Sequence, residues 1–222
     1  MQTETPFASF LSTYRTKRFP KGQILLHQGE STEDVFVLRH GAIKLFNIDE
    51  QGNEKILHII ETMAAFPIFH HMAEKPLLSW FYAAITDVEV TVMPFKALKE
   101  AMTTNPDILR EVMIHCAREV HELFVRLDSM GKSTTKAKLI AALKFLVVQH
   151  STEIGGGWHR ITFPVSHQLL ADMTGITRES ITVAIRSLQK EGLVRSPQLS
   201  VVEVDFPGLI AFGAPTDSSF AS

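Results

Sequence analysis

The spacing of hydrophobic and polar positions changes twice along this chain of 222 residues. From Arg18 to about Pro94, Gly29, Gly41 and a polar turn from Asp49 to Asn53 separate short β-rich runs: ILLHQG, VFVLRHGAIKLFNI, KILHII, SWFYAAI and VEVTVM. Several short strands at near-regular spacing predict a sandwich, roll or barrel.

A helical pattern begins after this region. The run FKALKEAMTT predicts a short helix, and Asn105-Pro106-Asp107 predicts a stop followed by a long helix, since proline suits a first helical turn. Apolar residues then recur at alternating separations of four and three, the rhythm of a coiled-coil seam: Leu109, Met113, Cys116, Val120, Leu123, Leu127 and Met130. This stripe either covers the protein's own β-rich region or pairs with a second subunit, and its place between two regions favours a homodimer interface.

The pattern changes again at the segment from Gly131 to Thr135, which we interpret as a hinge. Gly131 can adopt left-handed dihedral angles, and Ser133 or Thr134 can cap the next helix, which runs from Lys136 to about His150. A glycine-rich loop (Gly155, Gly156 and Gly157) follows this helix.

Two short helices joined by a tight turn come next. Ser166 caps a helix from His167 to about Met173, Gly175 supplies the turn, and Thr177 opens a second helix that runs to about Glu191. The second helix carries one apolar face, which we expect to pack against Leu169, Leu170 and Met173: Ile181, Ala184, Ile185 and Leu188. The runs LVR and LSVVEV, with a Pro197-Gln198 turn between them, predict a hairpin that forms a wing beside this helix.

The other face of the second helix is suited to a DNA groove. Arginine can donate two hydrogen bonds to guanine, glutamate can accept from cytosine, hydroxyl groups can hold phosphates, and valine can contact a thymine methyl group. The candidate DNA-contacting residues are Thr177, Arg178, Glu179, Ser180, Thr182, Val183, Arg186 and His167. An ordinary three-helix packing unit is the alternative interpretation.

Composition narrows the class of protein. With 45% hydrophobic and 21% charged residues the chain has the composition of a soluble globular protein, and its net charge of −2 requires any DNA-binding surface to be local. A single cysteine, Cys116, excludes an internal disulfide and four-cysteine zinc or iron–sulfur sites. The N-terminal segment lacks the pattern of an export signal and no stretch resembles a membrane span, so we expect a cytoplasmic protein with no membrane partner. The tail from Gly213 has the composition of an unstructured segment.

Four motifs, in their order and spacing over residues 18–206, resemble the CRP/FNR superfamily, which is named for the catabolite activator protein and the fumarate and nitrate reductase regulator. They are FPKGQILLHQGE, VFVLRHGAIKLFNIDEQGNEKIL, NPDIL and GITRES. The resemblance implies an α+β protein: an N-terminal antiparallel β-roll like a cyclic-nucleotide-binding jelly roll, a long dimerisation helix and a C-terminal winged helix-turn-helix. We place the effector-sensing domain at residues 1–105, the dimerisation helix and hinge at 106–133, and the DNA-binding domain at 134–222.

The resemblance also implies a function. The chain is expected to be a sequence-specific transcription regulator, a homodimer on an inverted-repeat site of double-stranded DNA, with RNA polymerase as a further partner. Thr177, Arg178, Glu179, Ser180 and Val183 stand at the family's DNA-contacting stations. Val183 replaces an arginine that is common in the family, so the preferred half-site is expected to differ.

The effector region departs from cyclic-nucleotide binders. In the stretch ETMAAFPIFHHMAEKPLLSW, Leu78 stands in place of the phosphate-binding arginine, Ser79 keeps the neighbouring hydroxyl, and no Gly-Glu pair lies between Met63 and Met72. Without the guanidinium, burying a cyclic phosphate would cost several kcal/mol. An apolar pocket for a small hydrophobic effector, or an interior filled by its own side chains, fits this region, and the candidate pocket residues are Phe66, Ser79, Phe81, Leu123 and Phe124.

Four alternatives concern effectors, cofactors and catalysis. His70 or His71, beside Met72, could ligate haem as in gas-sensing relatives, and Cys116 could sense oxidation, although a small apolar filler is the ordinary role of such a cysteine. Cyclic-nucleotide binding itself is a further alternative. A metal-binding cupin would need a closely spaced His-x-His motif that His27 and His58 do not form, so we expect no cofactor, no metal and no enzymatic activity.

Overall fold

The computed structural model describes residues 5–61 and 63–212, apart from the side chains of residues 129 and 130. The chain divides into two compact units, residues 1–123 and 124–222, and the boundary lies inside the long helix α4 (Pro106–Met130). This division differs from the boundaries expected at 105 and 133, because the last part of α4 belongs with the C-terminal unit. The tail from Gly213 lies outside the described residues.

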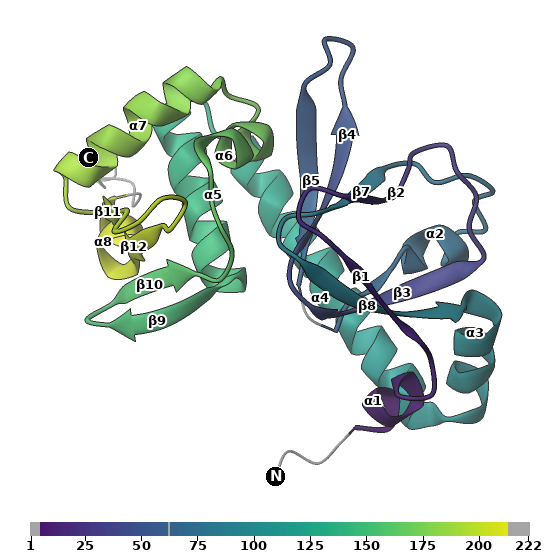
Figure 1. Ribbon diagram of the computed structural model, residues 1–222. Helices are drawn as coiled ribbons and strands as arrows, with labels where there is room; N and C mark the ends of the chain where they lie inside the picture. The colour runs from purple at the N-terminus through teal and green to yellow at the C-terminus, as the bar shows by residue number, and fades with distance from the viewer. Residues whose placement is uncertain (1–4, 62, 213–222) are drawn as a thin grey trace, which may run out of the picture. The chain divides into compact units, whose positions relative to one another are not determined.

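The first unit is a roll of two antiparallel sheets with helices beside it (Figure 1). One sheet has the order β1-β8-β3-β6 and the other β2-β7-β4-β5. The strands are β1 (Thr16–Phe19), β2 (Ile24–Leu26), β3 (Asp34–His40), β4 (Ile43–Ile48), β5 (Glu54–Ile60), β6 (Ala65–Phe66), β7 (Phe81–Ala84) and β8 (Val88–Pro94). The helices of this unit besides α4 are α1 (Pro6–Leu11), α2 (Ile68–Met72) and α3 (Phe95–Thr104).

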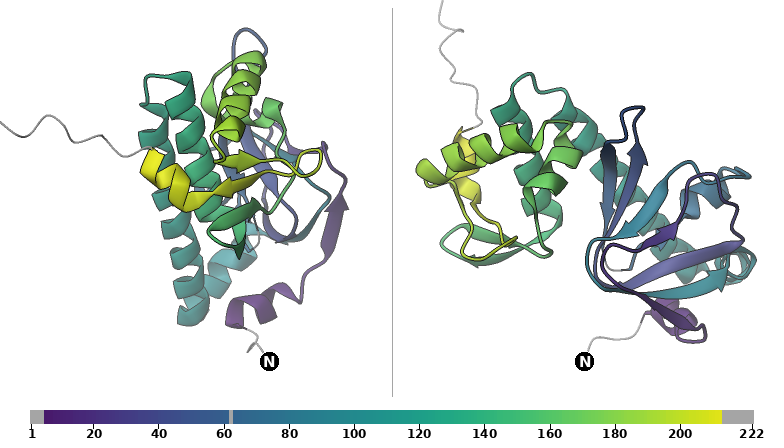
Figure 2. Two further views of the ribbon diagram at one scale, coloured as in Figure 1. Left: turned by 90° about the vertical axis from the view of Figure 1, so that its left-hand side faces the viewer. Right: turned by 45° about the horizontal axis from the view of Figure 1, so that its top comes forward.

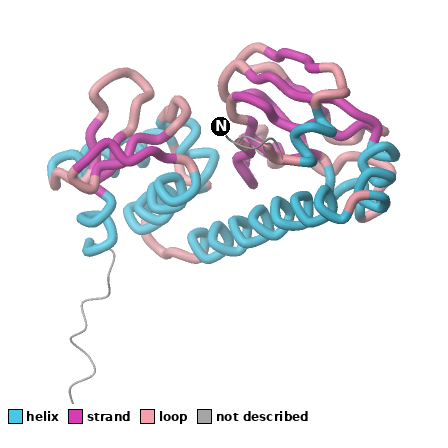
Figure 3. Tube along the Cα trace, turned by 90° about the horizontal axis from the view of Figure 1, so that it is seen from below, coloured by secondary structure: helices cyan, strands magenta, loops and turns pink. Residues whose placement is uncertain are grey.

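Strand β3 shows why this sequence forms a roll with covered sheets. Its residues alternate between two cores, because successive side chains of a strand point to opposite faces. Phe36 and Leu38 belong to the core between the two sheets, whereas Val35 and Val37 belong to a second core. That second core includes buried residues of α1, α3 and α4: Phe7, Leu11, Leu98, Met102, Ile108 and Val112. Figure 3 shows α4 in cyan running along the strands of this unit.

The predicted β-rich runs and the helix FKALKEAMTT are confirmed. Strands β2, β3, β4, β5, β7 and β8 fall within or next to the five runs, and α3 spans the ten residues of that motif. Short elements were not predicted: β1, β6, α1 and α2. Each spans six residues or fewer, too few for a periodic pattern to stand out.

The second unit is a group of helices with a small sheet (Figures 1 and 2). The helices are α5 (Thr135–Gln149), α6 (His167–Thr174), α7 (Arg178–Lys190) and α8 (Phe206–Phe212). The sheet has the order β11-β12-β10-β9 and contains β9 (Ser151–Gly155), β10 (Trp158–Ile161), β11 (Val194–Arg195) and β12 (Glu203–Asp205). The predicted wing is therefore present as β11 and β12, with a second strand shorter than the run LSVVEV.

Two local interpretations of this region need correction. The glycine-rich segment is the turn of a hairpin between β9 and β10 rather than a plain loop, and Gly155, Gly156 and Gly157 all have positive φ angles that the turn requires. Gly131 is not left-handed: α4 ends at Met130, and the amide of Gly131 donates to the Asp128 carbonyl at 3.2 Å. The predicted cap is confirmed for Thr134, whose hydroxyl accepts from the amide of Ala137 at 3.1 Å. Within residues 5–61 and 63–212, no helix is both long and apolar enough to cross a membrane.

Candidate nucleic-acid interface

The helix-turn-helix is built as the sequence predicts. The Ser166 hydroxyl accepts from the amide of Leu169 at 3.0 Å and so caps α6. Gly175 ends α6 in a left-handed conformation with φ of 66°, and its amide donates to the Ala171 carbonyl at 2.9 Å. Thr177 then caps α7, because its hydroxyl accepts from the amide of Ser180 at 3.3 Å.

The apolar face of α7 is buried as predicted. Ile181, Ala184, Ile185 and Leu188 are all buried, and α7 contacts both α5 and α6. At the far end of α7, Lys136 of α5 donates to Glu191 at 2.6 Å, and this hydrogen bond lowers the pKa of the Glu191 carboxyl. The helix is therefore held along its length, so the positions of its outward side chains are defined.

The outward face of α7 presents side chains with the chemistry needed to read bases. Arg178, Glu179 and Arg186 are exposed, and Val183 is 68% exposed. Along this helix Arg178 and Arg186 lie two turns apart on one side, so a groove that receives the helix would meet both. Figure 2 shows α7, in light green, at the outside of this group of helices.

Four of the predicted DNA contacts have structural partners within the protein. The Thr177 hydroxyl also donates to the Ser180 hydroxyl at 2.9 Å. The Thr182 hydroxyl donates to the Arg178 carbonyl at 2.9 Å, and His167 Nδ1 lies 2.9 Å from that hydroxyl. Since the hydroxyl proton is used by the carbonyl, the tautomer of His167 with a proton on Nδ1 satisfies both groups. His167 and Thr182 thus join α6 to α7, a role that the sequence did not reveal.

The wing strands carry a charged cluster that was not predicted. Glu203 is buried, and it accepts from Arg160 Nη2 at 2.6 Å and from Arg195 Nε at 2.5 Å. Burial by itself raises the pKa of Glu203, but the hydrogen bonds from both arginines outweigh it and lower that pKa. The Arg195 guanidinium also lies 4.1 Å from the centre of the Trp158 ring. Arg160 and Arg195 both face Glu203 across neighbouring strands, and this opposite charge was the sequence signal that could have revealed the cluster.

The predicted seam on α4 is largely exposed in the single chain. Leu109, Met113, Val120 and Leu127 are exposed, whereas Cys116 and Leu123 are half-buried, and the side chain of Met130 lies outside the described residues. Phe124, placed in the effector pocket by the sequence analysis, is also exposed, one turn beyond Val120 on this helix. Among the described residues, these placements leave the apolar stripe largely uncovered, and pairing through it remains a prediction.

The interior of the roll is filled where an effector pocket was expected. Leu78 is buried in the core between the sheets, and Phe66 stacks between Phe36 and Tyr82 with ring centres 5.6 and 5.3 Å apart. Ser79 is exposed, and Phe81 stacks on Phe46. Phe66 is therefore a core residue rather than a pocket wall. Of the two interpretations left open, these placements support an interior filled by the protein's own side chains.

An acidic group lies under α4, where the helix meets the roll. The Glu119 carboxyl is mostly buried, and burial together with the nearby Glu122 raises its pKa to about 8. Glu122 in turn lies 3.6 Å from His58 of β5, and burial and then Glu119 raise the pKa of Tyr82. These polar residues continue the buried stripe of Ile108 and Val112 at helical spacing, which was the signal that could have revealed them.

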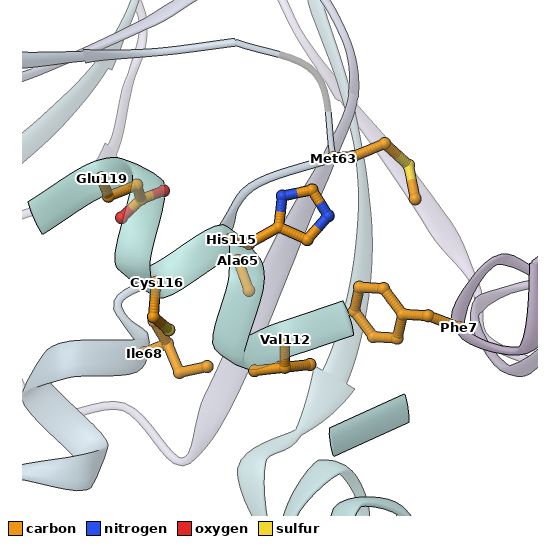
Figure 4. A pocket seen from close by; sticks show the side chains of 8 residues that line it. All are labelled: Phe7, Met63, Ala65, Ile68, Val112, His115, Cys116 and Glu119. Carbon is orange, nitrogen blue, oxygen red and sulfur yellow. The ribbon is translucent and has the colours of Figure 1, made fainter. Parts of the chain in front are cut away.

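Beside this group is a cavity of about 10 Å³, about the space for one water molecule (Figure 4). Figure 4 shows Val112, His115, Cys116 and Glu119 of α4 lining it together with Phe7, Met63, Ala65 and Ile68. Burial and then Glu119 raise the pKa of the Cys116 thiol, which favours the unreactive protonated form. The contacts of Cys116 thus fit the small-filler role better than the redox role.

The two adjacent histidines lie on α2. His71 stacks on Phe95 with ring centres 4.6 Å apart, and its Nε2 lies 3.0 Å from the Asp34 carbonyl. Burial, followed by the neighbouring His71, lowers the pKa of His70. The His71 ring is therefore committed to contacts within the fold.

A roll of two antiparallel sheets, a long helix and a winged helix-turn-helix with an exposed, arginine-bearing second helix define a class: transcription regulators that couple a sensing domain to a DNA-reading domain. Comparison with protein families gives the same division. Residues 16–105 match the model of the cyclic nucleotide-binding domain, and residues 137–212 match the Crp-like helix-turn-helix domain. The chain belongs to the CRP/FNR family of transcription regulators.

Individual relatives cover nearly the whole chain. The cAMP-activated global transcriptional regulator CRP of Escherichia coli is 22% identical over 204 residues, covering 90% of this chain and 95% of that protein. The transcriptional regulator SdrP of Thermus thermophilus is 24% identical, covering 87% and 92%. Among solved structures, FixK2 from Bradyrhizobium japonicum has a TM-score of 0.75 at 16% identity and covers 91% of this chain and 98% of that one. The predicted fold class is confirmed.

Proposed function

We propose that this regulator is a homodimer that reads an inverted-repeat DNA site through α7 and works without a cyclic nucleotide. The observation that carries the DNA part is the exposed face of α7, where two arginines, a glutamate and a valine stand on a helix whose other face is fully packed. Paired about a two-fold axis, two such helices would enter successive major grooves about 34 Å apart. RNA polymerase is the partner we expect for the DNA-bound dimer.

The dimer part is supported by the exposed stripe of α4. Leu109, Met113, Val120, Phe124 and Leu127 are large apolar side chains on one side of a helix of 25 residues, and exposing them to water is unfavourable. A second copy of the helix, packed in the manner of a coiled coil, would cover them.

The effector part is supported by the filled interior. A cyclic nucleotide needs a cavity and a cation for its phosphate, whereas Leu78 is apolar and buried, and Phe66 and Tyr82 occupy the space between the sheets. This chain would thus differ from its cAMP-activated relative. The committed His71 ring is a further reason to propose a regulator that works without haem.

Selection from a random duplex library, with light scattering, tests the DNA and dimer parts together. We expect a dimer that selects an inverted repeat. Leu127→Asp should be monomeric and lose about 100-fold or more in affinity for that site, because it places a charge in the seam. Val148→Asp is the matched control, since Val148 is 62% exposed and Leu127 63%, and this variant should stay dimeric. A dimeric Leu127→Asp protein, or selection of a single half-site, would refute the proposal.

Calorimetry with cyclic AMP tests the effector part. We expect no heat of binding at millimolar ligand and no change in affinity for the selected DNA. A cyclic-AMP-dependent gain in DNA affinity would overturn this part and leave the DNA part intact.

A further inference from the structure

A buried arginine joins the end of α4 to the helix-turn-helix. Arg126 is only 4% exposed, and its Nη2 donates to the Met173 carbonyl of α6 at 2.6 Å, across 47 positions of sequence. Burial lowers the pKa of Arg126 to about 10, so the guanidinium is still charged at neutral pH. Both residues belong to the second compact unit, which begins at Phe124.

The acceptor of this hydrogen bond, the Met173 carbonyl, lies at a helix end, where carbonyl groups lack a partner within the helix. Met173 lies in the last turn of α6, and carbonyl groups there also carry the negative end of the helix dipole. The terminal amides of Gly175 and Ile176 both turn back to the Ala171 carbonyl instead. A guanidinium at Met173 therefore satisfies a free acceptor and adds a favourable charge interaction, so this contact is stronger than an ordinary surface hydrogen bond.

The place of this contact in the chain gives it a function. Arg126 precedes the connecting segment from Gly131 to Thr134, whereas Met173 precedes the turn that leads into α7. The connecting segment alone would tie α6 and α7 to α4 at one point and leave their orientation free. A second connection, the Arg126–Met173 hydrogen bond just before the turn between α6 and α7, would fix that orientation.

We propose that Arg126 is a positioning residue: it holds the recognition helix α7 at a fixed orientation to the end of α4, and in the dimer it thereby sets the spacing of the two half-sites. The second clause rests on the proposed dimeric function; the first does not. A consequence is that the segment Gly131–Thr134 is not a free hinge, because turning α6 and α7 about it requires the Arg126–Met173 hydrogen bond to break.

Spin labels test the positioning directly in the full chain. One label at Asp128→Cys on α4 and one at Lys190→Cys on α7, in a Cys116→Ser background diluted with unlabelled protein, report the distance between these helices. We expect a narrow distribution with Arg126 and a distribution at least about twice as broad in Arg126→Met, which keeps the bulk but removes the donors. Arg126→Lys should lie between them. Equal widths in all three proteins would overturn the proposal.

A separate binding experiment tests whether Arg126 sets the spacing of the two half-sites. Binding to inverted repeats whose spacer varies one base pair at a time should show a sharp optimum for the wild type, and Arg126→Met should bind the neighbouring spacers with about tenfold less discrimination. Lys132→Met, which removes an exposed cation paired only to Asp128 in the described contacts, should keep the sharp optimum. A folded Arg126→Met protein with the wild-type optimum refutes the clause.

The two measurements separate the possible failures. If the wild type selects no inverted repeat, the dimeric function fails while the distance widths still decide the role of Arg126. If Arg126→Met does not fold, the Arg126→Lys protein decides: a distribution as narrow as the wild type's and an unchanged spacer optimum would overturn the proposal.

Discussion

The core of the β-roll and the outer face of α7 differ in whether their side chains are accessible to a ligand. In the roll, the positions that the resemblance assigns to an effector are occupied by packed side chains, with Leu78 buried and Phe66 stacked between two rings. On α7, the positions assigned to DNA are exposed, and the helix beneath them is held by Ile181, Ile185 and Leu188. The face predicted to read DNA is thus exposed on a packed helix, whereas Phe66 and Leu78, in the region predicted to take an effector, belong to the core.

The largest expected effect comes from removing a buried side chain from the core of the β-roll. Phe66→Ala should destabilise the protein by about 3–5 kcal/mol, because it removes a buried ring and leaves a cavity between two aromatic neighbours. Chemical denaturation measures this effect. Phe69→Ala, an exposed position on α2, is the control and should change the stability by less than about 1 kcal/mol. An equally mild effect at Phe66 would mean that the roll is not tightly packed there.

The next effect concerns pH. The pKa of Glu119 is raised from its ordinary 4.5 to about 8, so folding favours its protonated form. Its contribution to stability is fully present below pH 4.5 and is lost as the pH rises through about 8. We expect the midpoint of thermal unfolding to fall as the pH rises from about 5 to about 8, which corresponds to a loss of stability on the order of a few kcal/mol, and the contribution of Glu119 to level off above that range.

The Glu119→Gln protein provides the control for that pH dependence, because glutamine mimics the neutral carboxyl and does not titrate. His58, Tyr82, His115, Cys116 and Glu122 surround the site and remain in the variant. The variant should show a flatter profile from about pH 5 to 8 than the wild type. Identical profiles would assign the loss of stability over this range to another group.

On the exposed face of α7, Arg178→Ala should weaken binding to the selected site by about 1–3 kcal/mol. It should weaken binding to random duplex much less, as expected for a base contact. Electrophoretic mobility shift at a fixed salt concentration measures both. Lys190→Ala removes the same charge from the other end of α7 and should act weakly and equally on both duplexes. Equal losses for Arg178→Ala would make Arg178 a phosphate contact.

The smallest expected effect distinguishes a hydroxyl that only caps a helix from one that also contacts DNA. Thr177→Ala and Ser166→Ala each remove a hydroxyl that caps a helix, and each should cost about 1 kcal/mol in stability. Only Thr177→Ala is expected also to reduce specific DNA affinity, because Thr177 stands at the exposed start of α7. If the two variants lose affinity equally, Thr177 acts through the helix alone.

Sequence patterns predicted the elements that are long or have strong end signals. Ser166, Gly175 and Thr177 each act locally, so the bounds of α6 and α7 were predicted within one residue. The stripe on α4 was predicted as one seam, but Cys116 and Leu123 turn partly toward the protein's own core, since a helix of 3.6 residues per turn drifts from a seven-residue repeat. Arg126 could not be found this way, because its partner Met173 is 47 positions away and only the fold brings the two together. Glu119 and the pair of Arg160 and Arg195 on Glu203 left weaker signals, in helical spacing and in opposite charges on neighbouring strands, which the sequence analysis did not use.

The burial of Leu78 has a bearing on how this lineage can change. The backbone of Leu78 is hydrogen-bonded to Gly29 and Glu30, and its side chain is part of the core. Leu78→Arg alone would put a charge among Phe66, Tyr82 and their neighbours, at a cost greater than most proteins of this size can bear. Placing a phosphate ligand at this position would therefore require several coordinated exchanges rather than a single mutational step.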